Sequence, residues 1–358
     1  MFKKALSGIA MSMAMASPSY AQALKVAVDI APLHSLVAQV MDGVSEPELL
    51  IRPEMSPHAY NLRPSEAKSL SDADVVFWIG EGLTPWLEKP LSSLAGSATK
   101  IEMMEVEGTT LYEFREGATF EGHDHHDEAQ DEHDDKHGHH DNEAHGEHDD
   151  KHAHHDDEAH NEHNDKHEHH DEEEHDDHAE AHEHHHDGHD PHVWLDPKNA
   201  EVWLNQIAKT LGEADSEHAQ NYQDNAKAAI SRLHKLSSII EQQAEDLKEV
   251  KFIVFHDAYQ YFEQRFQLLA TGAISISDAS KPSPARISEI RQTVKELGVT
   301  CVFTEPQYNP ELVNSVFENS TVKTIGTMDP LGANLAIGKD QYNQLLMAMI
   351  ESLSQCER

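Results

Sequence analysis

Short apolar runs alternate with segments of helical periodicity through the first third of the chain. Continuous or alternating apolar runs are typical of strands, whereas apolar positions three or four residues apart are typical of helices. By these criteria we expect strands at 24–30, 49–51, 75–79 and 99–106, with helices at 32–41 and 65–70. This β-α alternation predicts a mostly parallel sheet covered by helices.

The same alternation returns near the end of the chain, with strands expected at 251–255, 269–276, 300–304 and 322–327, and helices at 258–266, 287–297, 310–318 and 341–353. A helix is expected at 199–211. The stretch 216–250 contains no Pro or Gly and is long enough for a helix of roughly 50 Å. We therefore predict an α/β protein with two β/α domains, 24–212 and 250–358, linked by one long helix at 213–249.

Residues 122–189 interrupt the first predicted domain with a different composition. They are almost entirely His, Asp, Glu, Ala, Gly, Asn and Lys, and they hold 24 of the 30 histidines in an imperfect 15-residue repeat. No side chain in this segment is an aromatic or an aliphatic larger than Ala, so burial cannot offset the entropy of ordering it. We expect a disordered, His-rich acidic insertion.

The net charge of −39 is concentrated in this insertion, because residues 121–190 alone carry −26 and the rest of the chain only −13. There is no basic surface that would suit nucleic acid, and anionic membranes would repel the protein. No segment beyond the N-terminus is apolar enough to cross a bilayer. We expect no nucleic-acid partner and no stable membrane insertion.

The N-terminal residues 1–23 have the pattern of a secretory signal peptide. Two lysines precede a short apolar stretch, and small residues follow it at the expected cleavage point. The protein is therefore expected in the periplasm as a soluble chain. In an oxidising compartment Cys301 and Cys356 are expected to form one structural disulfide, with two buried free thiols as the alternative.

Six histidines lie outside the insertion. Three of them, His34, His218 and His234, fall within helical patterns without a local chelating partner and are interpreted as ordinary helix residues.

The other three histidines have positions that suit a ligand site. His58 follows the expected strand 49–51, His256 ends the expected strand 251–255, and His192 lies where the insertion ends. Asp329 also follows an expected strand. Because ligands of open α/β sheets bind beyond the carboxyl ends of the strands, all four residues are candidates, although spacing alone leaves each histidine open to a structural interpretation.

Four motifs carry a resemblance to a known family: 56–65 (SPHAYNLRPS), 190–197 (DPHVWLDP), 255–262 (FHDAYQYF) and 327–332 (TMDPLG). With them the chain resembles the metal-binding receptors of ABC importers for zinc and manganese, in particular the zinc branch of ZnuA-like proteins. The resemblance spans nearly the whole chain after residue 23, and the acidic insertion and long linking helix also match the zinc branch.

The resemblance implies that His58, His192 and His256 bind one Zn²⁺ at the domain interface. The manganese branch has a carboxylate in place of His256, and three neutral imidazoles suit zinc better than manganese. Some zinc receptors carry a glutamate where Pro57 stands, so water or Asp329 must complete the coordination. We expect water, with Asp329 close by.

The expected function is that of a non-enzymatic, monomeric zinc-binding protein that delivers Zn²⁺ to an ABC permease. The insertion is expected to add weaker zinc sites. A zinc-dependent hydrolase or hydratase with three histidines and a water is the alternative from another class. A manganese receptor and a passive metal store are the remaining alternatives.

Overall fold

The computed structural model describes residues 23–115, 117, 119–120, 188–275, 282–308, 310–318, 320, 322 and 324–356. Residues 1–22 of the expected signal peptide and 122–187 of the expected insertion lie outside the described residues.

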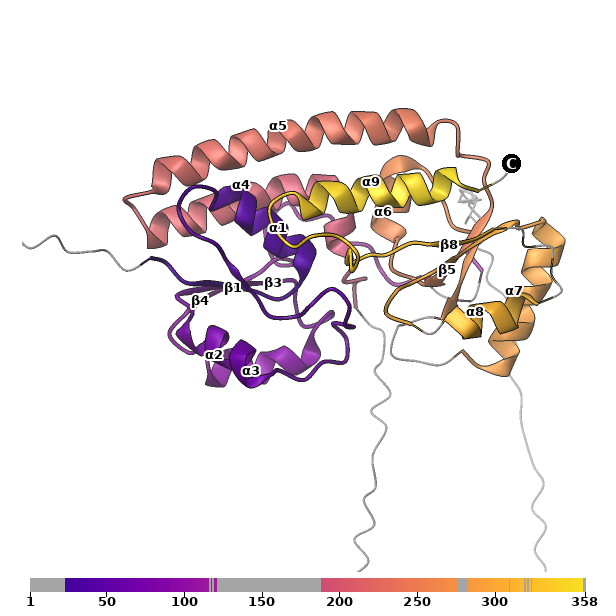
Figure 1. Ribbon diagram of the computed structural model, residues 1–358, viewed down its shortest axis with the longest axis horizontal. Coiled ribbons are helices and arrows are strands. Elements are labelled where there is room, and N and C mark those ends of the chain that lie inside the picture. Colours follow the sequence, from indigo (N-terminus) through magenta and orange to yellow (C-terminus); the bar gives the residue numbers. More distant parts are fainter. Residues whose placement is uncertain are drawn as a thin grey trace, which may run out of the picture. The chain divides into compact units, whose positions relative to one another are not determined.

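The first half of the chain forms a fully parallel four-stranded sheet in the order β2-β1-β3-β4. Its strands are β1 (Val26–Val28), β2 (Glu48–Leu49), β3 (Val75–Trp78) and β4 (Thr99–Glu102). Helix α1 (Ala31–Val40) covers one face, and α2 (Pro64–Asp72) and α3 (Glu88–Ser93) cover the other (Figure 1). A short 3₁₀ helix, η1 (Pro85–Leu87), leads into α3.

The last part of the chain repeats this arrangement with a second fully parallel sheet, in the order β6-β5-β7-β8. Its strands are β5 (Phe252–His256), β6 (Gly272–Ser275), β7 (Cys301–Thr304) and β8 (Thr324–Thr327). Helices α7 (Pro284–Leu297) and α8 (Pro310–Phe317) lie on one side of it, with α6 (Gln260–Phe266) and α9 (Gln341–Ser354) on the other. The predicted α/β fold with two parallel sheets is confirmed.

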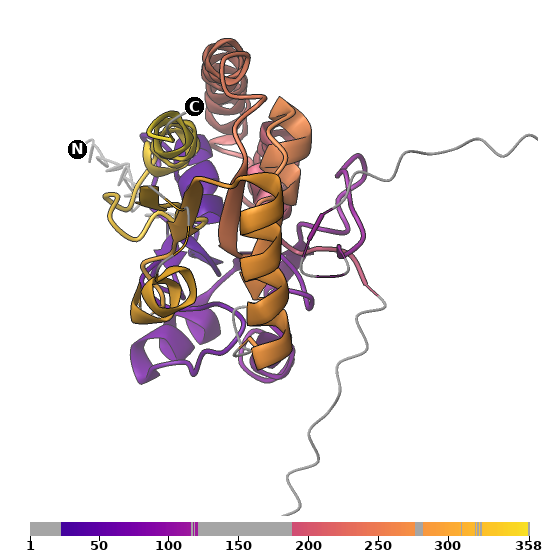
Figure 2. The same ribbon diagram turned by 90° about the vertical axis from the view of Figure 1, so that its right-hand side faces the viewer.

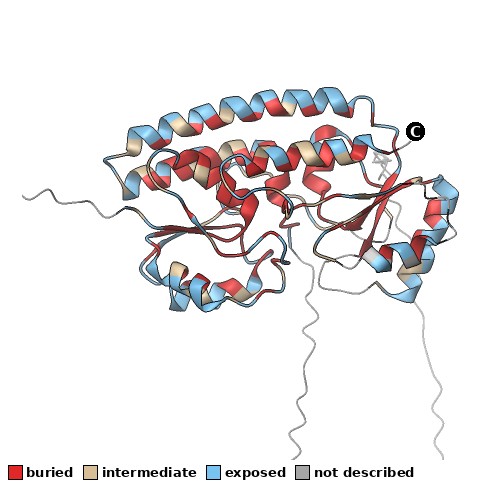
Figure 3. Ribbon diagram, in the orientation of Figure 1, coloured by how far each residue is buried: buried red, intermediate tan, exposed pale blue. Residues whose placement is uncertain are grey.

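Two long helices connect these parts, α4 (Pro197–Ala214) and α5 (Ala219–Ala244), and the 3₁₀ helix η2 (Val193–Leu195) precedes them. Helix α5 buries one face, through residues three or four positions apart such as Tyr222, Ala226 and Ala229, and exposes the opposite one (Figure 3). It packs against α4 and α1 and also against α6 and α9. Seen end-on in Figure 2, α5 and α9 lie side by side.

The linking helix is shorter than the pattern predicted, with 26 residues in α5. Asp215 ends α4, and its carboxylate accepts hydrogen bonds from His218 and from Tyr222, which fixes the turn between the two helices. Helix α3 was not predicted from the sequence, because Pro90 lies within it. Over the described residues, none of the helices is long and apolar enough to cross a membrane.

One large apolar core extends from the first sheet through α4 and α5 to α9, while a smaller core fills the space between the second sheet and α7 and α8. Helix α9 is held at both ends: the backbone N–H of Tyr342 donates to Ser35 Oγ of α1, and Cys356 is disulfide-bonded to Cys301 of β7. The predicted disulfide is confirmed. By the loop-entropy argument its 55-residue separation corresponds to about 4 kcal/mol of stabilisation.

A buried ionic cluster holds the segment that precedes the insertion. The Arg115 guanidinium donates hydrogen bonds to the carboxylates of Asp257 and Glu263, and its carbon lies 3.7 Å from the centre of the Phe120 ring. The side chains of Arg115, Asp257 and Glu263 are only 13%, 10% and 2% exposed. Removing the charge of Arg115 would leave two buried carboxylates without a compensating positive charge. The loss of one partner of a buried ion pair costs more free energy of unfolding than replacement of both partners by apolar groups.

We therefore expect Arg115→Met to lower the free energy of unfolding by about 3–5 kcal/mol, measured by urea denaturation of metal-free protein. Lys68→Met is the control, because Lys68 pairs with Asp72 at the surface and its side chain is 72% exposed. That exposed pair should contribute less than about 1 kcal/mol. Equal losses in the two variants would contradict the structural role of Arg115.

Candidate metal centre

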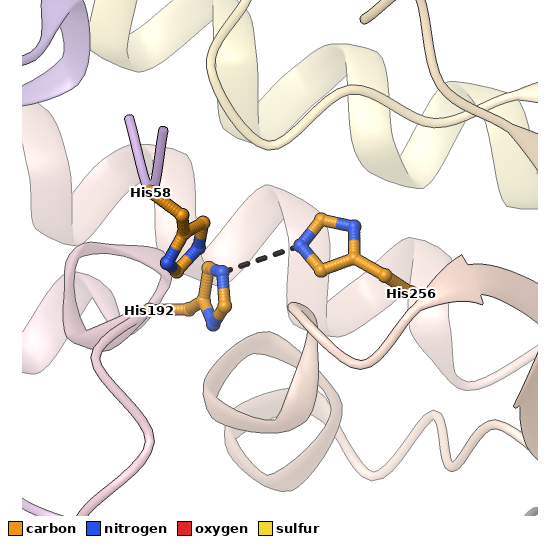
Figure 4. A group of neighbouring side chains, drawn as sticks. All are labelled: His58, His192 and His256. Carbon is orange, nitrogen blue, oxygen red and sulfur yellow. Dashed lines mark hydrogen bonds between the residues drawn. The ribbon is translucent and has the colours of Figure 1, made fainter. Parts of the chain in front are cut away.

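Three histidines from separate parts of the chain meet in one group. His58 lies in the loop between β2 and α2, His192 immediately precedes η2, and His256 ends β5. One ring nitrogen of each lies within 4.8 Å of the others, and Figure 4 shows the rings turned toward one another. The structure thus brings together the three histidines that the sequence singled out.

The group is largely removed from solvent. His192 is 5% exposed and His256 is 3% exposed, whereas His58 is half-buried. The backbone beside His58 is held in place by Trp86, whose indole N–H donates to the Pro57 carbonyl over 2.7 Å. A partly buried indole used in this way fixes a loop that has no regular secondary structure of its own.

Two buried carboxylates set the protonation of two of the rings. Nδ1 of His192 lies 2.7 Å from Asp190 Oδ1, and Nδ1 of His256 lies 2.7 Å from Glu305 Oε1. Because an ionised carboxylate only accepts hydrogen bonds, each Nδ1 is assigned as the protonated donor. The lone pair of each neutral ring is then on Nε2, the atom that faces the centre of the group.

The two Nε2 atoms of His192 and His256 are 3.3 Å apart, the separation marked in Figure 4. With both Nδ1 atoms protonated, neither Nε2 of the neutral rings can donate to the other. Nitrogen ligands at 2.0–2.1 Å from a tetrahedral ion lie about 3.3–3.4 Å from each other. The observed spacing therefore matches two ligands of one small cation.

Burial acts strongly on the two supporting carboxyl groups. It raises the pKa of Asp190 to about 6, against the lowering effect of the His192 backbone N–H and the nearby Arg115. Burial likewise raises the pKa of Glu305, and the hydrogen bonds from His256 oppose this shift. A negative charge that is buried away from water is stabilised by a cation close to it.

Among the residues that the structure describes, the group consists of the three histidines, and Asp329 is not a member of it. Its Oδ1 accepts hydrogen bonds from the Leu331 N–H and the Gln307 amide, both at 3.0 Å, and its Oδ2 accepts one from the Ala333 N–H. The carboxylate is thus used to hold the loop after β8.

The three histidines interpreted as ordinary helix residues lie outside the group. Nε2 of His34 is 2.9 Å from the Pro47 carbonyl, His218 bonds to Asp215, and His234 lies on the surface 3.2 Å from Glu201.

The sequence reasoning missed the two supporting carboxylates, although a signal existed for each. Glu305 directly follows strand β7, the neighbour of the strand that ends in His256, so the carboxyl ends of both strands meet at one edge. Asp190 stands two positions before His192, close enough to bond both its ring and its backbone N–H.

The pocket beside the group is small, about 10 Å³, and partly open, and it is lined by the three histidines, Trp194, Glu305 and Gln307 among others. That is room for a single water-sized or ion-sized particle. The fold and the site together define a two-part α/β protein with a histidine cluster, able to hold a metal ion, where its halves meet.

Similarity to known proteins shows to which family of α/β proteins this chain is related. The sequence model of the ZnuA family, described as zinc-uptake complex component A, periplasmic, matches residues 26–356. The chain is 44% identical over 331 residues to the high-affinity zinc uptake system protein ZnuA of Brucella abortus (strain 2308), with 92% of this chain and 91% of that protein covered. The corresponding protein of Paracoccus denitrificans (strain Pd 1222) is 39% identical over 341 residues, covering 95% and 94%. The chain belongs to the ZnuA family.

Solved structures agree on the fold. A crystal structure of ZnuA superimposes with a TM-score of 0.67 at 20% identity, covering 94% of this chain and 100% of that one. A zinc-bound deletion mutant of ZnuA gives 0.66 at 19% identity, covering 94% and 98%. At these identities the likeness shows the shared fold alone.

We expect Glu305→Gln to weaken binding of Zn²⁺, the ion that three imidazoles suit, by about 10–100-fold, because an amide no longer fixes the tautomer and basicity of His256. Competition with a chromophoric chelator measures the change. Glu201→Gln is the matched control, since its carboxylate faces the exposed His234 and should leave the affinity unaltered. An unchanged affinity in Glu305→Gln would show that Glu305 has no part in the site.

Proposed function

We propose that this protein captures Zn²⁺ in the periplasm through His58, His192 and His256 and delivers it to an ABC permease. The observation that carries the proposal is the convergence of three imidazoles whose ring nitrogens lie within 4.8 Å of one another. Relatives that match more than nine-tenths of the chain bear the name of a high-affinity zinc uptake protein, which supports the same cargo.

The donor set favours zinc over manganese. Neutral imidazole nitrogens suit the borderline-soft Zn²⁺, whereas Mn²⁺ prefers more oxygen ligands. The nearest carboxylates, Asp190 and Glu305, bond to Nδ1 atoms of the histidines and so support them from behind.

Binding is favoured over catalysis by the size of the cavity. A hydrolase or hydratase with a metal-bound water must admit a substrate beside the metal, and the space of about 10 Å³ beside the histidines is room for one small particle. Asp329, the residue that could formally act as a base, is engaged by two backbone N–H groups and the Gln307 amide. We propose a non-enzymatic receptor on this basis.

Water is the proposed fourth ligand of the ion. The cavity has room for one such particle next to the histidines, and Asp329 is committed to its own loop. Asp329 then contributes charge near the ion and holds the loop after β8, without direct ligation.

The insertion is proposed as a weaker, multi-ion collector of zinc. Its 24 histidines offer many chelating pairs, and its charge attracts divalent cations. The described residue at its end, His189, forms an antiparallel bridge with Glu113, and the Asp190 N–H donates to the Tyr112 carbonyl. The insertion therefore ends three positions before His192, beside the proposed transport site.

The remaining proposals concern the setting of the protein. The family is described as periplasmic, which supports export by the predicted signal peptide at 1–23. A permease of the ABC class is the proposed partner, the monomer is the proposed form, and nucleic acid is not a proposed partner. The two domains are proposed to divide at the linking segment 213–249.

Replacing any one of the three histidines with Ala should weaken tight zinc binding by about 100-fold or more, because two histidines leave the ion largely hydrated. Titration of a chain that lacks 122–187, with a competing chelator, measures this loss without interference from the insertion. His218→Ala and His234→Ala serve as controls and should bind as the parent chain does.

Asp329→Ala should cost less than His256→Ala in the same titration. A loss as large as that for His256→Ala would favour direct ligation by Asp329. Wild-type affinity in any of the three histidine variants would remove that residue from the proposed ligand set.

Deleting 122–187 should leave a folded protein with one tight zinc site and lower the total zinc bound at saturation. The deletion keeps His189, so the bridge to Glu113 that closes the base of the insertion is retained. Calorimetric titration of the full and shortened chains gives both stoichiometries. A shortened chain that folds but has no tight site would place the transport site within the insertion.

A further inference from the structure

Gln307 joins three loops that surround the histidine group. It follows Glu305 in the loop after β7, and its Nε2 donates to the Pro53 carbonyl at 2.9 Å and to Asp329 Oδ1 at 3.0 Å. Pro53 lies in the loop between β2 and α2 that also carries His58, and Asp329 lies in the loop after β8. We refer to these two hydrogen bonds as the Gln307 latch.

The chemistry of the partners determines how the amide is oriented. A backbone carbonyl and a carboxylate can only accept hydrogen bonds, so the NH₂ group of Gln307 must face both of them. Asp329 is itself fixed by the N–H groups of Leu331 and Ala333. Gln307 Oε1 is buried and accepts no hydrogen bond from any residue that the structure describes. The latch is therefore specific for an amide, because a carboxylate at this position would oppose two acceptors.

The latch closes the wall of the cavity that holds the proposed zinc site. Ser56 and Pro57 line this cavity from the first half of the chain, and Gln307, Tyr308 and Leu331 line it from the second. The space beside the histidines is only about 10 Å³, so an ion that leaves them passes these lining residues, and separation of the loops widens its path. Separation requires that the bond between Gln307 and the Pro53 carbonyl break.

We propose that the Gln307 latch governs the rate at which zinc leaves the site, with Gln307 acting as a positioning residue that holds the loops of both halves over the ion. The inference rests on the proposed zinc site. It predicts a kinetic effect that is separate from ligation, since Gln307 holds the loops and the histidines hold the metal. Differences in affinity among closely related sites are commonly differences in the dissociation rate.

The test measures zinc release from the purified full chain. Protein loaded with one equivalent of Zn²⁺ is mixed rapidly with excess chromophoric chelator, and the slow phase is assigned to the tight site by its loss in His256→Ala. Gln307→Ala and Gln307→Glu should each accelerate the slow phase by about tenfold, the effect of losing one well-placed hydrogen-bonding group. The slow phase should still account for one zinc per chain.

The matched control is Asn225→Ala. The Asn225 amide also makes two hydrogen bonds to acceptors far apart in sequence from it, the Val40 and Asp42 carbonyls, at 2.9 and 2.8 Å, and none of these residues lines the histidine pocket. Its removal should leave the release rate unchanged. The melting temperatures of metal-free Gln307→Ala and Asn225→Ala are then compared. A general loss of stability would lower both of them, whereas an effect on release alone would not.

Each outcome decides between the proposals. A release rate in Gln307→Ala and Gln307→Glu equal to that of the unmodified chain would overturn the latch while leaving the zinc site intact. Acceleration in Asn225→Ala of the same size would also overturn it, since any lost amide would then suffice. A slow phase that survives in His256→Ala would overturn the proposed zinc site itself, and the latch with it.

Discussion

Three imidazole lone pairs directed at one point repel one another until a cation lies between them, and much of this structure serves to hold them there. Carboxylates behind His192 and His256 fix the two rings. The loops around them are fixed in turn: Tyr261 O–H donates to the Asp190 carbonyl, and Trp194 N–H donates to the Pro330 carbonyl. These bonds supply in advance the ordering that metal binding would otherwise have to bring about.

The two sheets have the same strand order, but the residues at equivalent strand ends have different roles. In each, the order reverses beside the first strand, where the ends of the first and third strands leave a crevice. In the second sheet His256 and Glu305 occupy that place. In the first, the buried Asp29 accepts hydrogen bonds from the Ile30 and Ile79 N–H groups and so ties the crevice shut. Burial raises the pKa of Asp29 to about 7. The crevice of the second sheet therefore contributes side chains to the histidine group, whereas the crevice of the first sheet is closed by structural hydrogen bonds. The first half of the chain reaches the group through loops instead.

Apolar periodicity, a local signal, predicted the strands and most helices, and an even pair of cysteines in a chain expected to be exported predicted the disulfide. Strand-end positions made His58, His192 and His256 candidates, and the resemblance to a known family implied that they converge. The sequence did not predict Glu305 or Gln307 as part of the site. Glu305 bonds to His256 at the end of the neighbouring strand, a position that strand-end reasoning could have suggested. The role of Gln307 depends on which loops lie opposite, at Asp329 and Pro53, and a side-chain hydrogen bond between distant loops leaves no periodic trace. The length of α5 was overestimated for a similar reason, since the bonds from His218 and Tyr222 to Asp215 decide where the helix begins.

Tight capture and rapid delivery make opposite demands on such a site. A receptor with a dissociation constant on the order of 1 nM and an association rate of about 10⁷ M⁻¹s⁻¹ would keep its ion for about 100 s. Because affinity cannot be lowered without losing capture, release must follow a change in structure at the moment of delivery. The space of about 10 Å³ beside the histidines leaves the ligands little room to move while the surrounding loops stay in place. The contacts that bridge the loops of the two halves are where a partner can act, because breaking them opens a path while the histidines still hold the metal.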